Sequence, residues 1–298
     1  MTGVTDAAAS AVATASTVHR PTTTVPSPTT PTTKPWRRYV AVGDSFTEGM
    51  VDPDPQRPDE FIGWADRLAQ RLAADRDGER FDYANLAVRG RLLDDVVGPQ
   101  LDTALSMRPD LVSIVGGGND ILRPHADLDA IADRLEAAVI RLREAGCDVI
   151  LATTADPGSA PVLKVVRPRC AIHATNVWAI AQRHGCFVID MFSMRALRDP
   201  RMWGADRIHL SSEGHTRVAA QALWALNGGH GERPWSESLE PQQLSVAEAI
   251  GGHAAWVAGH LAPWVRRRLQ GRSSGDARTA KRPQLAPVVE SIADAVPE

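Results

Sequence analysis

Short apolar runs rich in β-branched residues alternate along the chain with longer segments in which apolar residues recur at helical spacing. The short runs predict five strands, over residues 39–42, 83–88, 111–115, 149–151 and 187–189. The longer segments predict five helices, over residues 61–74, 92–106, 126–145, 170–184 and 212–226. Strands that alternate with helices form right-handed crossovers and a parallel sheet covered on both faces. The pattern therefore predicts an α/β fold, in which binding sites form at the carboxyl ends of the strands.

The alternating pattern occupies residues 36–228, which we interpret as one domain. Before it, twelve of the fifteen residues from 21 to 35 are proline or threonine. Such a segment buries too little apolar surface to offset the entropy of ordering the chain. Residues 1–35 are therefore predicted to form a disordered arm.

The chain after residue 228 has a different character. Residues 229–270 are expected to form a helical extension packed on the domain, and residues 271–298 a flexible tail. Within the extension, residues 245–269 are predicted to be a single helix. Seven basic residues and one acid lie between 266 and 282. This run indicates either a solvated helix end with a tail or a contact with an anionic surface.

Composition narrows the class of protein. The chain has 298 residues, 43% of them hydrophobic, and a formal net charge of −3, which argues against a whole-surface nucleic-acid binder. No run reaches the length of a membrane span, and no secretory signal is recognisable, so we expect a soluble, cytoplasmic protein. Of the three cysteines, Cys147 and Cys186 each precede a predicted strand. Free thiols are expected, and a disulfide would require these two strands to be neighbours.

Residues suited to acyl-transfer chemistry follow four of the predicted strands. Ser45 follows the first strand, Gly90 the second, Asn119 the third, and Asp206 with His209 the fifth. A serine hydroxyl is a weak nucleophile and needs a base that is itself oriented by a third group. His209 is the candidate base and Asp206 the candidate orienting group. The backbone N–H groups of Ser45 and Gly90 and the side-chain amide of Asn119 are the candidate donors of an oxyanion hole.

Each of these motifs is common by itself. The hypothesis of a catalytic site therefore rests on finding all four in this order, each after a predicted strand. His215 is an alternative base, but Ser211 or Ser212 caps the helix that follows, which puts His215 in its first turn, where a positive charge is disfavoured. Asp44 and Asp120 are expected to bind backbone groups and fix their loops.

Two other families are disfavoured by their motifs. The α/β-hydrolase elbow has the pattern G-x-S-x-G, whereas the serine here lies in Gly-Asp-Ser-Phe-Thr, without the second glycine. The three glycines at 116–118 form neither the G-x-G-x-x-G motif of dinucleotide sites nor a Walker sequence.

The four blocks resemble those of the GDSL/SGNH hydrolase family: Ser45 in G-D-S, Gly90, Asn119 in G-x-N-D, and His209 in D-x-x-H. The resemblance covers roughly residues 37–227. It implies a three-layer α/β/α fold with a five-stranded parallel, flavodoxin-like sheet, a Ser45–His209–Asp206 triad, and neither a metal nor another cofactor. Two positions depart from the family pattern: phenylalanine replaces the usual leucine after the serine, and Ala87 stands where many members have glycine.

We therefore expect a serine hydrolase that cleaves small carboxylic esters, with a small-molecule ester as its substrate, no nucleic acid as a partner, and an anionic surface as the alternative contact of the basic C-terminal run. A thioesterase or acyltransferase would use the same triad, and a non-catalytic binding protein could retain the fold. The loop over 155–169 carries Lys164, Arg167 and Arg169, a basic cluster that is either solvated or selects an anionic substrate. The sequence does not decide among acyl esters, thioesters and acetylated sugars.

Overall fold

The computed structural model describes residues 36–55, 57–76, 78–160, 163–237, 239, 259 and 275–288. The arm predicted for residues 1–35 and almost all of the helix predicted for 245–269 lie outside these residues.

Eight strands and nine helices are found in the described part of the chain. The strands are β1 (Arg38–Val42), β2 (Pro53–Asp54), β3 (Arg57–Phe61), β4 (Asp82–Asn85), β5 (Leu111–Ile114), β6 (Asp148–Ala152), β7 (Phe187–Ile189) and β8 (Arg282–Pro287). The helices are α1 (Ser45–Glu48), α2 (Trp64–Ala74), α3 (Leu93–Asp95), a π-helix (Val96–Gln100), α4 (Leu101–Ser106), α5 (Gly118–Ile121), α6 (Leu128–Glu144), α7 (Arg167–His184) and α8 (Ser212–Leu226). Short 3₁₀ turns complete the connections.

The main sheet has six strands in the order β7-β6-β5-β1-β4-β8. The five strands from β7 to β4 are parallel, in the flavodoxin-like order predicted from the sequence. The prediction of five strands is corrected by β8, which pairs antiparallel with β4. The chain reverses its direction of travel across the sheet at β1, so the carboxyl end of β1 lies at the switch point where α/β folds bind ligands.

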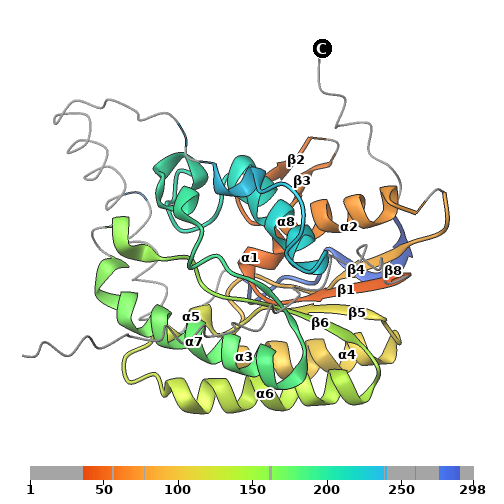
Figure 1. Cartoon of the computed structure of the whole chain (residues 1–298), viewed down its shortest axis with the longest axis horizontal. Coiled ribbons are helices and arrows are strands. Elements are labelled where there is room, and N and C mark those ends of the chain that lie inside the picture. Colours follow the sequence, from red (N-terminus) through yellow and green to blue (C-terminus); the bar gives the residue numbers. More distant parts are fainter. Residues whose placement is uncertain are drawn as a thin grey trace, which may run out of the picture. The chain divides into compact units, whose positions relative to one another are not determined.

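Helices cover both faces of the sheet (Figure 1). A hydrophobic core lies between the sheet and each of the two helical layers. Alternate residues of β1 serve both, since Val40 and Val42 belong to one core and Tyr39 and Ala41 to the other. Helices α4, α6 and α7 cover the first face, and α2 and α8 cover the second. The strands are buried on both faces, which explains why they are continuous apolar runs.

Strand β8 was not predicted, and it lies in the segment expected to be a flexible tail. Its sequence, Arg-Pro-Gln-Leu-Ala-Pro, carries little of the apolar alternation that identifies strands. It adds to the side of β4 that would otherwise be the open edge of the sheet. Prolines are tolerated there because an edge strand needs donors on one side only.

The helix predicted over 92–106 is interrupted by the π-helix. Pro99 lies inside this π-helix, and a proline has no N–H to donate to the preceding turn. The other helices predicted within the described residues are present, and α6 ends at Glu144, one residue before the predicted bound; Gly146, which follows its cap, has a left-handed φ of 81°. Strands β6 and β7 are neighbours, yet Cys147 and Cys186 are both free thiols.

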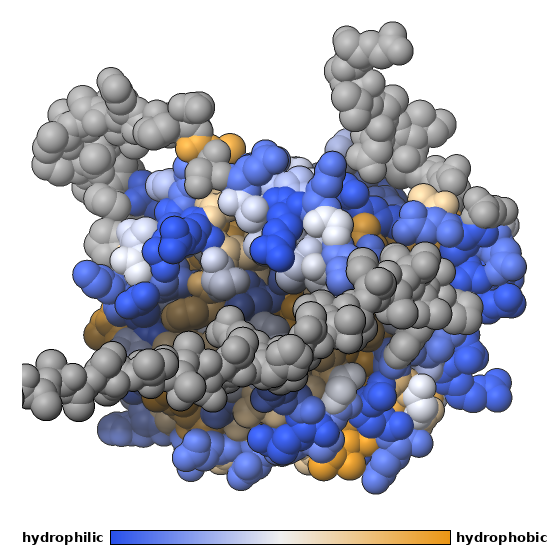
Figure 2. Space-filling view, viewed as in Figure 1, coloured by the Kyte–Doolittle hydropathy of each residue, from blue (hydrophilic) through white to orange (hydrophobic). Residues whose placement is uncertain are grey.

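Hydrophilic residues cover most of the visible described surface, and hydrophobic residues gather in a hollowed band between the two helical layers (Figure 2). Among the described helices, none combines the length and apolar content that crossing a bilayer requires.

The packing of α6 gives a test of the fold. Leu142 is fully buried under the sheet, so Leu142→Ala is expected to lower the free energy of unfolding by about 2–5 kcal/mol, measured by urea denaturation. Ile140 lies on the same helix but is 39% exposed, so Ile140→Ala should cost much less. Equal losses in the two variants would contradict the placement of the apolar face of α6.

Candidate active site

Ser45 is the first residue of α1, directly beyond the carboxyl end of β1. Asp44 caps this short helix, because one of its carboxylate oxygens accepts the N–H of Phe46 at 3.1 Å. The helix ends at Gly49, whose φ of 88° is the left-handed conformation that favours glycine. The chain therefore turns sharply on both sides of Ser45.

A chain of hydrogen bonds joins Ser45, His209 and Asp206. His209 Nε2 lies 2.9 Å from Ser45 Oγ, and His209 Nδ1 lies 2.6 Å from Asp206 Oδ2. The other oxygen of Asp206 accepts the backbone N–H groups of Ile208 and His209, each at 3.0 Å. The Asp206 carboxylate therefore binds the backbone of its own loop through one oxygen and the imidazole of His209 through the other. Together these contacts fix the orientation of the imidazole.

The environment of Asp206 favours its charged form. Burial acts to raise the pKa of this carboxyl, but the hydrogen bond and charge of His209 and the two backbone N–H groups outweigh it, so the pKa lies below its usual range. A carboxylate in this state can stabilise an imidazolium on its neighbour. The arrangement can remove a proton from the Ser45 hydroxyl and hold it on His209.

The three candidate oxyanion donors differ in their surroundings. The backbone N–H groups of Ser45 and Gly90 have no hydrogen-bond acceptor among the described residues. Gly90 has a φ of 74°, a conformation that glycine adopts without strain. Asn119 Nδ2, in α5, donates to Asp44 Oδ2 at 3.1 Å and to the Arg91 carbonyl at 3.0 Å. Both amide hydrogens of Asn119 therefore have protein acceptors.

Asp44 and Asp120 both accept hydrogen bonds from backbone N–H groups, as expected from the sequence. Asp120 Oδ2 accepts the N–H of Leu93 at 2.9 Å, which ties α5 to the start of α3. Asp44 has in addition the bond to Asn119, which the sequence did not indicate. Burial raises the pKa of Asp44 to about 6. The hydrogen bond from the Phe46 N–H and the charge of His209 lower this pKa, but burial outweighs them.

A buried ion pair connects α1 to the loop that carries Gly90. The Glu48 carboxylate accepts the backbone N–H of Arg89 at 2.6 Å and the Nε–H of the same residue at 2.9 Å. The two side chains are only 11% and 10% exposed. Because Arg89 precedes Gly90, this pair sets the distance between two of the candidate oxyanion donors. No sequence motif identified it.

His215 is not in a position to act as the base. It follows the Ser211 cap of α8, as predicted, but its Nδ1 accepts the backbone N–H of Trp64 at 3.2 Å. Burial lowers the pKa of His215 to about 3, so the imidazole is neutral. The imidazole ring of His215 stacks on the ring of Phe46, with 6.1 Å between the ring centroids, and so packs against helix α1.

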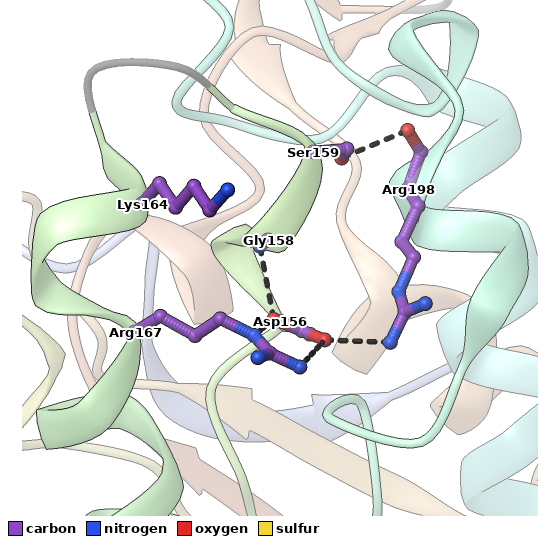
Figure 3. A pocket seen from close by; sticks show the side chains of 6 residues that line it. All are labelled: Asp156, Gly158, Ser159, Lys164, Arg167 and Arg198. Carbon is purple, nitrogen blue, oxygen red and sulfur yellow. Dashed lines mark hydrogen bonds and ion pairs between the residues drawn. The ribbon is translucent and has the colours of Figure 1, made fainter.

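A basic cavity of about 310 Å³ lies at the same edge of the sheet, in the loop after β6 (Figure 3). Its polar core is Asp156, whose buried carboxylate accepts hydrogen bonds from Arg167 Nε at 2.7 Å and from Arg198 Nη2 at 2.6 Å. The Arg167 guanidinium in particular holds the pKa of Asp156 below its usual range. Lys164 also lines the cavity, and its amino group has no acceptor among the described residues.

No group of three or more potential metal ligands is found among the described residues.

A pH dependence of stability follows from the buried histidines. Burial lowers the pKa of His173 to about 4, from an ordinary value of 6.5. The unfolded chain therefore binds a proton on this group between pH 6.5 and 4 that the folded chain does not, so stability is lost as the pH falls through this range. In His173→Gln, we expect a smaller loss of unfolding free energy between pH 7 and pH 4.5, measured by urea denaturation at both. The exposed His230 gives the control, and a loss in His173→Gln equal to that in His230→Gln would contradict the assignment.

Comparisons with solved structures support the fold. TesA is 22% identical, with 65% of this chain and 100% of that chain covered and a TM-score of 0.54. The acetylxylan esterase Axe2 of Geobacillus stearothermophilus is 20% identical, with 68% and 97% covered and a TM-score of 0.52. A lipase/acylhydrolase of Enterococcus faecalis is 24% identical, with 64% and 96% covered and a TM-score of 0.52. At such identities these similarities show the fold alone.

Sequence comparisons identify the family. The uncharacterised protein YpmR of Bacillus subtilis is 33% identical over 86 residues, which make up 28% of this chain and 31% of that relative. The chain thus matches about a third of the length of this relative. A model of the GDSL-like lipase/acylhydrolase family matches residues 41–217, which is more than half of the chain and runs from the end of β1 into α8. The chain therefore belongs to the GDSL-like lipase/acylhydrolase family.

Proposed function

We propose that the protein is a serine hydrolase that cleaves carboxylic esters through an acyl-enzyme. The observation that carries the proposal is the hydrogen-bonded series Ser45 Oγ, His209 Nε2, His209 Nδ1 and Asp206 Oδ2, with separations of 2.9 and 2.6 Å. These are the distances over which a base removes the proton of a nucleophile and is oriented by a carboxylate. Membership of the family and the names of similar structures, which include esterases and a lipase/acylhydrolase, support the same reaction class.

The reaction would proceed in two stages. In the first, the Ser45 oxygen bonds to the ester carbonyl carbon while His209 takes its proton, and the carbonyl electron pair moves to the oxygen. The tetrahedral intermediate collapses as His209 gives the proton to the departing alcohol, which leaves the acyl group on Ser45. In the second stage, His209 takes a proton from the water whose oxygen attacks the acyl carbon. His209 then returns this proton to Ser45 Oγ as the bond between that oxygen and the acyl carbon breaks, and the carboxylic acid is released. Asp206 stays ionised throughout and stabilises the imidazolium.

Three donors would stabilise the oxyanion: the backbone N–H groups of Ser45 and Gly90 and the amide of Asn119. The backbone groups are free to donate, whereas Asn119 must exchange one of its present acceptors for the substrate oxygen. We propose that the Arg91 carbonyl is released, because the Asp44 carboxylate also holds the amide in place from the side of the nucleophile helix. An oxyanion is a stronger acceptor than a carbonyl, which favours this exchange in the transition state.

Ser45 is the residue that the proposed reaction depends on most directly. Ser45→Ala should lower kcat for p-nitrophenyl acetate by roughly 10⁵-fold or more and abolish covalent labelling by a fluorophosphonate probe. The matched control is Ser193→Ala, since Ser193 is an exposed serine whose hydroxyl donates to the Asp190 carbonyl. A wild-type chain that neither turns over esters nor accepts the probe would instead support a non-catalytic binding protein. Faster turnover of acyl-CoA than of matched oxygen esters would favour a thioesterase.

The cavity around Asp156 suggests the class of substrate. Three cations line it against a single carboxylate, so it carries a net positive charge even with both arginines paired. Arg169, from the first turn of α7, donates to the Ile121 carbonyl of α5, so this end of α7 contacts the helix that carries Asn119. Strand β6 is two strands from β1, which corresponds to roughly 10 Å. We propose that the cavity binds an anionic group of the acyl chain at about this distance from the ester.

A matched pair of substrates tests this. The mono-p-nitrophenyl ester of suberic acid carries a carboxylate at the far end of an eight-carbon chain, and p-nitrophenyl octanoate lacks it. Lys164→Met should raise the KM of the suberate ester several-fold more than that of the octanoate, because only the former loses an ion pair. Steady-state kinetics at low ionic strength measure this ratio. An equal change for the two esters would show that the cavity is merely solvated.

A further inference from the structure

Residues 275–288, here called the C-terminal segment, contact the candidate active site although they lie outside the span matched by the family model. The segment contains β8, which pairs with β4, and it places Gly275 against the Arg89 carbonyl. A Cβ at position 275 would overlap that carbonyl oxygen, so only glycine permits this approach. Arg89 is the residue before Gly90, a candidate oxyanion donor. The segment is thus in direct contact with the loop that forms the site.

Lys281 is the centre of these contacts. Its Nζ donates to the Glu48 carbonyl at 2.7 Å, to the Phe61 carbonyl at 2.8 Å and to Asp66 Oδ2 at 2.6 Å. An ammonium group has three protons, so each has an acceptor. The Lys281 side chain is 8% exposed, and so is that of Asp66. Two of the three acceptors are backbone carbonyls, so the contact restrains main chain and does more than neutralise Asp66.

The Glu48 carbonyl belongs to the helix that carries Ser45. Helix α1 has four residues, and at a rise of 1.5 Å per residue Ser45 and Glu48 are only about 4.5 Å apart along its axis. Helices leave their last carbonyls without partners inside the helix, and Lys281 supplies one for Glu48. On the other side, Gly49 packs backbone to backbone against Gly63, the residue before α2. The end of α1 is therefore held between the start of α2 and Lys281.

The same residue connects α1 to the second oxyanion donor. The Glu48 carboxylate holds the backbone N–H and the guanidinium of Arg89, next to Gly90. Lys281 fixes the main chain of Glu48, and Glu48 fixes that of Arg89. A displacement of α1 would thus change the position of Ser45 and Gly90 together.

We propose that Lys281 is a positioning residue for ester hydrolysis, which holds the nucleophile helix and, through Glu48, the Gly90 loop in the reactive arrangement. This inference rests on the proposed function. It gives the C-terminal segment a part in the active site, beyond that of a tail or of an edge strand. Misplacement of reacting groups by about 1 Å can lower a rate by 10²-fold, so the effect should appear in kcat.

Lys281→Met is the direct test. We expect kcat for p-nitrophenyl acetate, counted per active site by probe titration, to fall 10- to 100-fold, with KM changed less than threefold. The rate of fluorophosphonate labelling should fall by a similar factor, because the same nucleophile and oxyanion donors act on the phosphorus centre. Arg278→Met is the matched control, since it removes an exposed positive charge from the same segment and should leave both rates unchanged.

Loss of Lys281 also takes its closest cation from the buried Asp66 carboxylate, and the remaining cation, Arg282, has its Nε 3.9 Å away, so the variant could unfold the chain. The double variant Lys281→Met/Asp66→Asn removes that charge and keeps an oxygen to accept the Gly63 N–H, which Asp66 now holds at 2.8 Å. The same fall in kcat is expected there, because the Glu48 and Phe61 carbonyls still lack their donor.

The outcomes separate the possibilities. A double variant that melts at a lower temperature but labels and turns over at the wild-type rate would show that Lys281 only stabilises the fold, and would overturn the proposal. A wild-type chain that is not labelled at all would instead overturn the proposed function, and this inference with it. Reduced kcat in both Lys281 variants, with Arg278→Met unchanged, supports the positioning role.

Discussion

The hydrogen bond between His209 and Ser45 depends on most of the fold, since it joins residues 164 positions apart in the sequence. Parallel strands bring their carboxyl ends to one edge, and the reversal of strand order at β1 leaves room there for α1. The loop with Asp206 and His209 then reaches Ser45 from just before α8, whose cap at Ser211 sets where that loop ends. The contact between His209 and Ser45 therefore requires the sheet, the crossover connections and helix α8 to be correctly placed relative to one another.

Helix α1 cannot be stable by itself, because four residues do not repay the cost of helix nucleation. Polar contacts at both of its ends stabilise this short helix instead. Asp44 caps the first turn and contacts Asn119, while Glu48 at the last turn contacts Arg89 and Lys281. Such groups are costly to bury unless they are satisfied, so each one constrains its neighbours to a single arrangement. Buried polar contacts thus add to the packing of Phe46 on Trp64 and His215 in holding the helix in place.

The sequence predicted those parts of the molecule that local patterns determine. Helix α8 has the predicted bounds, 212–226, because its apolar face and the Ser211 cap are both local signals. The five parallel strands and the order of the site residues along them could also be predicted, since buried strands are apolar runs. The apolar spacing over 92–106 does not show the π-helix, because Pro99 removes a backbone donor without changing the pattern of apolar side chains. Lys281 was missed because a basic run usually indicates solvent, and only a tertiary contact buries it.

Pro287, at the end of β8, has a consequence for how the molecule meets other copies of itself. The Val288 N–H donates to the Phe81 carbonyl, so by strand alternation the nitrogen of Pro287 lies on the outer side of β8. Because proline has no N–H, the outer border of the sheet lacks a donor there that a further strand would need. A fragment that stopped at residue 228 would expose the donors and acceptors of β4 instead. Strand β8 therefore covers the open side of β4 and presents in its place an edge less suited to pairing with another chain.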